Sequence, residues 1–246
     1  MNKTYHLWAS GNIEGRIGAY VRAWQTARSS GHPIPLARDP FVTLSREFGC
    51  EAVPTATRLV EILNERSHPT LPWVVYDREV LDQVARELHL QREIVESMDD
   101  TRRGEMAELF DALLNRKVDE ALMFRKLAEV VRSLASHGHS VIVGRGGYLI
   151  AHDLKTGLHV RLVAPHEWRV HKVAVEGNLT VRNAEKIVAE GERRRANFMR
   201  TFFAQDPLRP FPYDLTLDNS RFDPGQIAET IFTTLTARFG EKPLAA

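Results

Sequence analysis

Four charged residues are candidates for a functional site. Each of them follows a short apolar segment of the chain. They are Arg46, Asp77, Arg145 and Arg169. Arginine offers paired N–H donors in a fixed geometry, and that geometry matches the oxygens of a phosphate. A surface ion pair explains any one of these arginines about equally well. Taken together, three arginines and one carboxylate at one place favour an anionic ligand, most simply a phosphate.

The elements that must position these residues are predicted from apolar runs and helical spacing. Predicted strands lie at 41–44, 73–76, 141–143, 158–163 and 215–217, and helical patterns lie at 55–65, 80–136, from Pro165 onward, 181–203 and 225–238. Short apolar strands that alternate with helices indicate a parallel sheet covered on both faces, which is an α/β fold. Ligands of such sheets bind beyond the carboxyl ends of the strands. We therefore expect the loops at 45–54, 77, 144–147 and 164–169 to bring the four charged residues together.

The loop after the first predicted strand departs from the usual phosphate-binding pattern. The motif GxxxxGK[ST] is absent, and the segment GCEAVP at 49–54 has one glycine, no lysine and an acidic residue, Glu51. Pro54 also lacks an N–H group that phosphate could use. Cys50 lies near a helix N-terminus, where the pKa of a thiol can be lowered. With no identifiable base, we expect Cys50 to be incidental rather than nucleophilic.

Six segments occur in an order that resembles a known family. They are VTLSREFG, VYDREVL, VIVGRGGYL, LHVRLVAPHEWRV, ERRRANFMRTFF and PYDLTLDNS. Over about residues 41–238 the chain resembles the cytidylate kinase-like family of P-loop kinases. The resemblance implies a three-layer P-loop kinase-like fold, with a mainly parallel five-stranded sheet and helices on both faces. It also implies a kinase-like domain at 41–240, with a helical acceptor-binding insertion at 78–137 and an arginine-rich lid at 166–205.

The resemblance assigns expected roles to individual residues. Ser45, Arg46 and Gly49 match a variant phosphate loop that binds ATP, Asp77 and Arg145 match acceptor-binding positions, and Arg169, Arg195 and Arg200 match catalytic lid arginines. ATP and Mg²⁺ are implied as well, and the acceptor is a nucleoside monophosphate or another small molecule. Where true cytidylate kinases carry an aspartate after the Gly-Arg pair, this chain has Gly146. Cytidine specificity is therefore not implied.

These assignments agree with the needs of phosphoryl transfer, which depends mainly on positioning and on positive charge near the phosphoryl oxygens. Arginines on a closing lid supply that charge when substrate is bound. The run at 193–195 cannot point inward as a whole, because consecutive helical residues face different directions. We expect one or two of the three to face solvent. No set of metal ligands is predicted, since His137 and His139 have no carboxylate or thiol within four residues.

Two functions from different classes follow from this sequence. The first is an ATP-dependent nucleotide or small-molecule kinase. The alternative is a non-catalytic, kinase-derived nucleotide-binding or regulatory module, which the departures at 51–53 and the N-terminal extension favour. A nucleic-acid-binding function rests only on the basic stretch at 182–200. The sequence favours the kinase slightly and does not identify its acceptor.

Composition limits the remaining possibilities. With 33 Lys and Arg against 32 Asp and Glu, the net charge of +1 argues against a general nucleic-acid binder. No run approaches 18 apolar residues, so we expect no membrane span, and the single cysteine fits a cytoplasmic protein. Residues 1–40 read as a helical extension with a proline-rich connector. Apolar residues at helical spacing between Ile13 and Trp24 make this extension the first candidate for a homo-oligomer contact.

Overall fold

The computed structural model describes residues 39–69, 72–78, 81, 120–203 and 211–240. Residues 39–78 and 131–240 of this set belong to one compact α/β unit, and residues 81 and 120–130 belong to a second. Most of the predicted insertion at 78–137 and nearly all of the extension at 1–40 lie outside the described residues. The insertion's role and the oligomer contact therefore stay predictions.

Five parallel strands form the sheet of the α/β unit, as the sequence predicts. They are β1 (Phe41–Arg46), β2 (Val74–Tyr76), β3 (Ser140–Val143), β4 (Gly157–Val163) and β5 (Leu215–Asp218), in the order β2-β3-β1-β4-β5. In the register, Val42 of β1 lies opposite Val141 of β3 on one side and Leu158 of β4 on the other. Strand β1 is therefore the central strand, where the strand order reverses. Ligands of open α/β sheets bind at the carboxyl end of such a strand.

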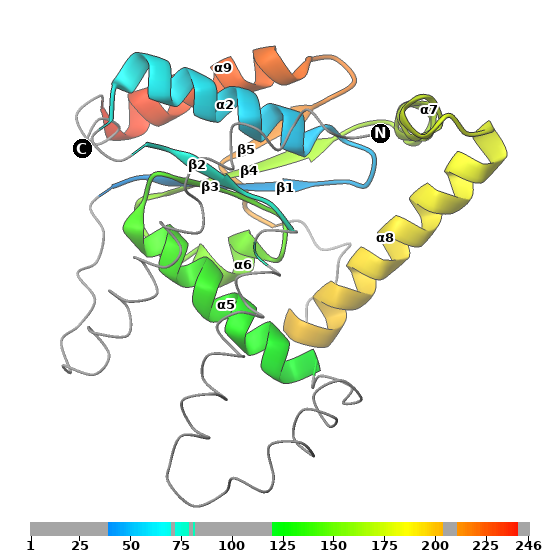
Figure 1. Cartoon of the computed structure of the whole chain (residues 1–246), viewed down its shortest axis with the longest axis horizontal. Coiled ribbons are helices and arrows are strands. Elements are labelled where there is room, and N and C mark those ends of the chain that lie inside the picture. The colour runs from blue at the N-terminus through cyan, green and yellow to red at the C-terminus, as the bar shows by residue number, and fades with distance from the viewer. Residues whose placement is uncertain (1–38, 70–71, 79–80, 82–119, 204–210, 241–246) are drawn as a thin grey trace, which may run out of the picture. The chain divides into compact units, whose positions relative to one another are not determined.

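Helices cover both faces of this sheet (Figure 1). Helices α2 (Ala52–Ser67) and α9 (Pro224–Phe239) pack on one face, where Leu44, Leu59 and Ile231 are fully buried. The opposite face carries α6 (Gly147–Ala151), a short helix that the sequence analysis missed. The three layers match the expected kinase-like architecture.

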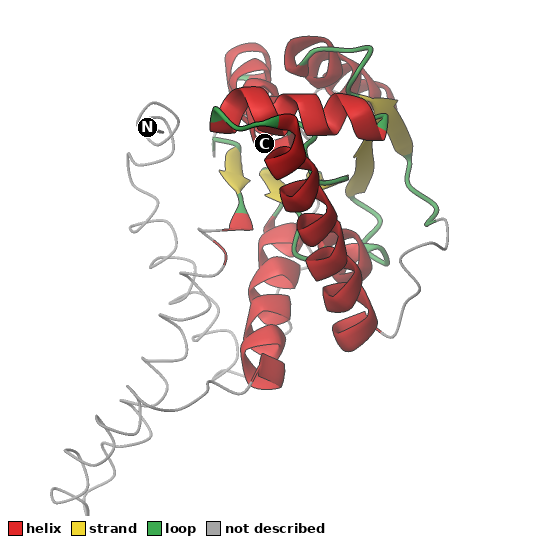
Figure 2. Ribbon diagram, turned by 90° about the vertical axis from the view of Figure 1, so that its right-hand side faces the viewer, coloured by secondary structure: helices red, strands yellow, loops and turns green. Residues whose placement is uncertain are grey.

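Three longer helices complete the description. Helix α5 (Glu120–His137) leads into β3, and α7 (His166–Gly177) and α8 (Val181–Phe203) follow β4. Asn178, at φ 49°, ends α7 in a left-handed conformation that turns the chain into α8. The two helices pack together beyond the carboxyl edge of the sheet, where Figure 2 shows α8 as a long straight helix. The predicted helix at 181–203 is confirmed to the residue.

Three predicted boundaries are wrong by a few residues. Arg46 is the last residue of β1 rather than a loop residue, because it pairs in register with Leu162 of β4. Helix α2 begins at Ala52, three residues before the predicted start, with Ala52 itself buried. Arg169 lies in the first turn of α7, where its N–H donates to the carbonyl of Pro165 at 3.1 Å.

Candidate functional site

Helix α8 contacts two of the loops at the carboxyl edge of the sheet. Gly191 lies against the ring of Phe48 from the loop after β1, so closely that any Cβ at position 191 would overlap that ring. Farther along the same helix, the Phe198 ring lies 5.9 Å from the guanidinium carbon of Arg145 in the loop after β3. Arg195 is four residues after Gly191 and three before Phe198, so it occupies the same face of α8. This face directs Arg195 toward the edge of the sheet.

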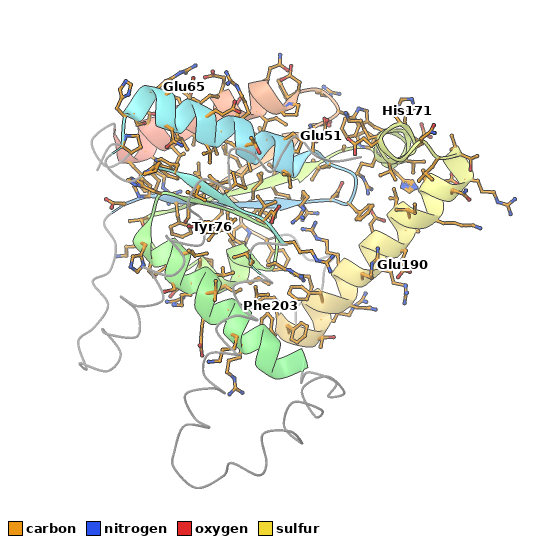
Figure 3. All side chains as sticks on the ribbon, in the orientation of Figure 1. Glu51, Glu65, Tyr76, His171, Glu190 and Phe203 are labelled. Carbon is orange, nitrogen blue, oxygen red and sulfur yellow. The ribbon has the colours of Figure 1, made fainter. Side chains whose placement is uncertain are left out.

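The neighbouring arginines of α8 point the other way. Arg193 and Arg194 are exposed, and both pair with Glu190, at 2.8 Å and 3.9 Å respectively. Glu190 lies on the outer side of α8 in Figure 3. The prediction that one or two of these three arginines face solvent is confirmed.

Arg46 extends from the end of β1 across the loop after β3. Its guanidinium lies against the Cα of Gly144, so closely that a Cβ at position 144 would overlap it. Gly144 also adopts φ +77°, a conformation that favours glycine. The glycine in "VGRGG" therefore makes room for the Arg46 side chain.

Positive charge accumulates around Arg46, and the nearby carboxylate of Asp77 offsets only part of it. Burial, followed by the charges of Arg195 and Arg145, lowers the pKa of Arg46 to about 10, while Asp77 acts in the opposite direction. Burial also lowers the pKa of Arg195. Among the described residues, neither Arg46 nor Arg195 makes a hydrogen bond or an ion pair. Buried guanidinium groups without acidic partners are costly unless an anion joins them. We call Arg46, Arg145 and Arg195 the arginine cluster.

Arg169 is engaged by the protein itself instead of facing the cluster. Its Nε donates to the carbonyl of Ala164 at 3.0 Å, and its Nη1 donates to the carbonyl of Phe48 at 3.0 Å. It also forms an ion pair with Glu192 of α8 and lies 3.5 Å from a carboxylate oxygen of Glu47. Arg169 is buried, and it joins α7, α8 and the loop after β1.

The other predicted site residues are Asp77, Ser45, Gly49 and Arg200, and they have different surroundings. Asp77 follows β2 and acts electrostatically on Arg46. Ser45 is buried within β1, and Gly49, at φ +93°, lies against the backbone of Arg169. Arg200 is exposed on α8, and its Nη1 donates to Asn197 at 3.4 Å. The structure does not bring Arg200 to the arginine cluster.

The loop after β1 uses most of its N–H groups internally. The N–H groups of Glu47, Cys50 and Ala52 donate to backbone carbonyls at 3.0–3.3 Å, and that of Glu51 donates to Asn219 Oδ1 at 2.7 Å. A phosphate-cradling loop instead directs such groups at the anion. The carboxylate of Glu51 accepts from Lys172 Nζ of α7 at 2.6 Å, and Figure 3 places Glu51 at the start of α2.

Cys50 is not an activated thiol. Burial, together with the nearby charge of Glu47, raises the pKa of Cys50 from 9.0 to about 11. The expected influence of the helix N-terminus is therefore outweighed. Its thiol is protonated at neutral pH, which agrees with an incidental role.

Arg161 and Tyr213, which were not predicted as site residues, also line this edge. Arg161 lies on β4, on the face opposite the buried Val160 and Leu162. Its guanidinium carbon lies 5.8 Å from the centre of the Tyr213 ring. An arginine within the otherwise apolar run "LHVRLVA" was the signal that could have revealed it, because strands buried on both faces are almost entirely apolar.

Within the described part of the chain, no three His, Cys, Asp or Glu side chains gather as a metal site would require. Magnesium often binds through one or two carboxylates plus the oxygens of a bound phosphate. Asp77 is a carboxylate whose charge acts on Arg46, and it fits that limited role. None of the described helices has the length and apolar character needed to cross a membrane.

The comparisons with known proteins agree with this fold. A family model described as cytidylate kinase-like matches residues 41–221, well over half of the chain. The chain belongs to the cytidylate kinase-like family. Its sheet and covering helices are those of a nucleotide kinase-like fold.

Individual relatives are distant. A uronate isomerase of Corynebacterium glutamicum is 24% identical over 143 residues, which are 58% of this chain and 26% of the isomerase. The matched region thus spans about a quarter of that protein's length. An uncharacterized protein of Eubacterium ventriosum has the same fold, with a TM-score of 0.60 and 17% identity, covering 82% of this chain and all of that one. TT1252 from Thermus thermophilus has a TM-score of 0.40 and 17% identity, covering 81% of this chain and 97% of that one.

Proposed function

We propose that this protein is a phosphotransferase that moves a phosphoryl group from ATP to a nucleoside monophosphate or another small acceptor. One observation carries the proposal. Arg46 and Arg195 lie partly buried at the carboxyl edge of the sheet, repel each other and have no acidic partner in the described structure. A phosphorylated ligand would supply the missing negative charge.

The arginine cluster and its neighbours Asp77 and Arg169 would have separate roles. Arg145 and Asp77, which follow β3 and β2, would hold the acceptor. Arg195 on α8 would approach the transferring phosphoryl group, and Arg46 would bind the phosphates from the end of β1. Mg²⁺, if held by Asp77 and phosphate oxygens, would neutralise part of the charge on the phosphates. Arg169 would act indirectly, by fixing α8 against the loop.

A second function, a non-catalytic nucleotide-binding or regulatory module, has its own supporting observation. The loop after β1 donates four of its N–H groups to the protein, and Glu51 places a carboxylate where a phosphate loop is usually free of acids. A protein of this kind would bind a nucleotide through the arginine cluster without transferring phosphate.

Product formation separates the two functions. The purified protein is incubated with ATP, Mg²⁺ and each common nucleoside monophosphate, and diphosphate products are separated by chromatography. We expect product with at least one acceptor, and a loss of roughly 100-fold or more in turnover for Arg195→Met, because each charge-stabilising contact contributes on that scale. Arg193→Met is the matched control, since Arg193 lies two residues away on α8 and pairs with Glu190.

The outcomes distinguish the proposals. Product that depends on Arg195 but not on Arg193 supports the phosphotransferase. Nucleotide binding without product from any acceptor supports the non-catalytic module. Product formed at equal rates by both variants would contradict the role given to the cluster.

A further inference from the structure

Arg161 combines partial burial with incomplete hydrogen bonding. Its side chain is 27% exposed, and its Nε is buried without a hydrogen-bond partner among the described residues. Its Nη2 reaches Glu47 Oε1 only at 3.4 Å, at the long limit for a hydrogen bond. Buried polar groups in proteins are nearly always satisfied, so an unsatisfied guanidinium N–H points to an acceptor that a ligand supplies.

Glu47 satisfies the hydrogen bonding of Arg161 only in part, because other groups share its carboxylate. Its Oε2 lies 3.5 Å from Arg169 Nε and accepts from the N–H of Ala164 at 3.2 Å. Glu47 therefore divides its two oxygens between Arg161 and Arg169, and it leaves the Nε of Arg161 without an acceptor. Arg161 also acts on Arg195, whose charged form it disfavours.

Tyr213 packs against Arg161, and hydrogen bonds of its neighbour Asp214 fix its position. The backbone N–H of Asp214 donates to the carbonyl of His159 at 2.8 Å, and the N–H of His159 donates to Asp214 Oδ2 at 2.7 Å. Arg238 fixes the other carboxylate oxygen of Asp214 at 2.7 Å. These bonds anchor Tyr213 beside β4, and its ring faces the Arg161 guanidinium at 5.8 Å. Stacking on an aromatic ring leaves the edge N–H groups of an arginine available to bind an anion.

We propose that Arg161 is a further ligand-binding residue of this site, and that Arg161 and Arg195 together hold a phosphoryl group of the ligand above Tyr213. This inference rests on the proposed function and deepens it. The arginine cluster and Arg161 then contribute four positive charges around the ligand. The nearby carboxylates of Glu47 and Asp77 contribute two negative charges. Such an excess of positive charge fits a ligand with two or more linked phosphates better than a single carboxylate or monophosphate.

Two probes and two substitutions test this inference. Calorimetric titrations with Mg-ATP and with inorganic pyrophosphate are made on the wild type, Arg161→Leu and Arg161→Lys. Pyrophosphate has no base or sugar, so it isolates recognition of linked phosphates. We expect Arg161→Leu to bind both probes roughly 10- to 100-fold more weakly, the range for a charged hydrogen bond, and Arg161→Lys to fall between. The dependence of affinity on salt should also be shallower in Arg161→Leu.

Controls separate this inference from the proposed function. Arg58→Leu, on the exposed side of α2 where Arg58 pairs with Glu61, should bind both probes like the wild type. If Arg46→Met loses binding while both Arg161 variants keep it, the role of Arg161 is wrong and the cluster stands. If the wild type binds neither probe, the phosphate site itself is wrong. Should Arg161→Leu fail to fold, the titrations of Arg161→Lys decide the question. Unchanged affinity for both probes and an unchanged salt dependence in Arg161→Lys would contradict the proposal.

Discussion

At the scale of single residues, Arg46 and Arg195 carry charges that destabilise the folded protein when no ligand is bound. Both guanidinium groups are partly buried. Burial lowers the pKa of each because it disfavours the charged form. Surface arginines such as Arg193 instead find a nearby carboxylate. Binding sites are often regions where removing a functional residue stabilises the fold.

This contrast makes a prediction for Arg195→Met. Without ligand, the variant should be as stable as the wild type or more stable, by up to about 1 kcal/mol, because a repelled charge is removed. Urea unfolding measures the change, and Arg193→Met serves as the control. A loss of more than about 2 kcal/mol for Arg195→Met alone would show that Arg195 is structural.

Arg169 should behave in the opposite way. Arg169→Met removes the ion-pair partner of Glu192 and a donor from two backbone carbonyls, and breaking a buried pair on one side costs about 3–5 kcal/mol. Because Glu192 is partly exposed, we expect the lower part of that range. The same urea titration checks this result. Wild-type stability together with lost turnover would instead return Arg169 to the catalytic role that the sequence suggested.

At the scale of elements, the contact between β1 and β4 depends on a neutral histidine. Thr43 Oγ1 and His159 Nδ1 are hydrogen-bonded at 2.7 Å, and the ring of Tyr148 from α6 packs edge-on against His159 at 5.2 Å. Burial lowers the pKa of His159 from 6.5 to about 4. The folded protein therefore resists protonation at a pH where the unfolded chain accepts a proton.

The direction of the pH effect follows from that shift. The stabilising contribution of neutral His159 is present above pH 6.5 and is lost as the pH falls toward 4. The loss is at most about 3 kcal/mol, at 1.36 kcal/mol per pKa unit. Urea unfolding at pH 7.5 and pH 4.5 should show a smaller acid-induced loss for His159→Gln than for the wild type. Equal losses in the two proteins would exclude His159 as the source.

Helix α8 depends on a close approach at Gly191. Gly191→Val would push the helix away from Phe48, and overpacking of this kind costs about 1–3 kcal/mol. The displacement should also weaken nucleotide binding, because Arg195 moves with α8. Ala189→Val, at an exposed position of the same helix, controls for the presence of a β-branched residue in α8. Equal stability and affinity for the two variants would contradict the contact's importance.

At the scale of the whole molecule, periodic patterns predicted the fold well. All five strands and the helix at 181–203 follow from apolar runs and helical spacing, which reflect burial directly. The short α6 was missed because a five-residue helix carries too few turns for a periodic pattern. The N-terminal helix and most of the insertion lie outside the described residues and stay predictions.

The candidate site was predictable only in part. The positions of Arg46, Asp77 and Arg145 follow from strand ends, which the sequence marks clearly. The bond between Arg169 and Phe48 joins residues 121 positions apart, and the contact of Arg161 with Tyr213 also joins distant parts of the chain. Local patterns carry no such information. Which arginines stay without acidic partners is likewise decided by tertiary packing.

The central claim is that the arginine cluster binds the phosphates of a nucleotide. Calorimetric titration with Mg-ATP, on the wild type, Arg46→Met and the control Arg193→Met, tests it most directly. We predict micromolar binding by the wild type and Arg193→Met, and a loss of roughly 10-fold or more in Arg46→Met, the scale of a charged hydrogen bond. Equal affinity of all three proteins, or no binding by the wild type at more than one temperature, would contradict the account.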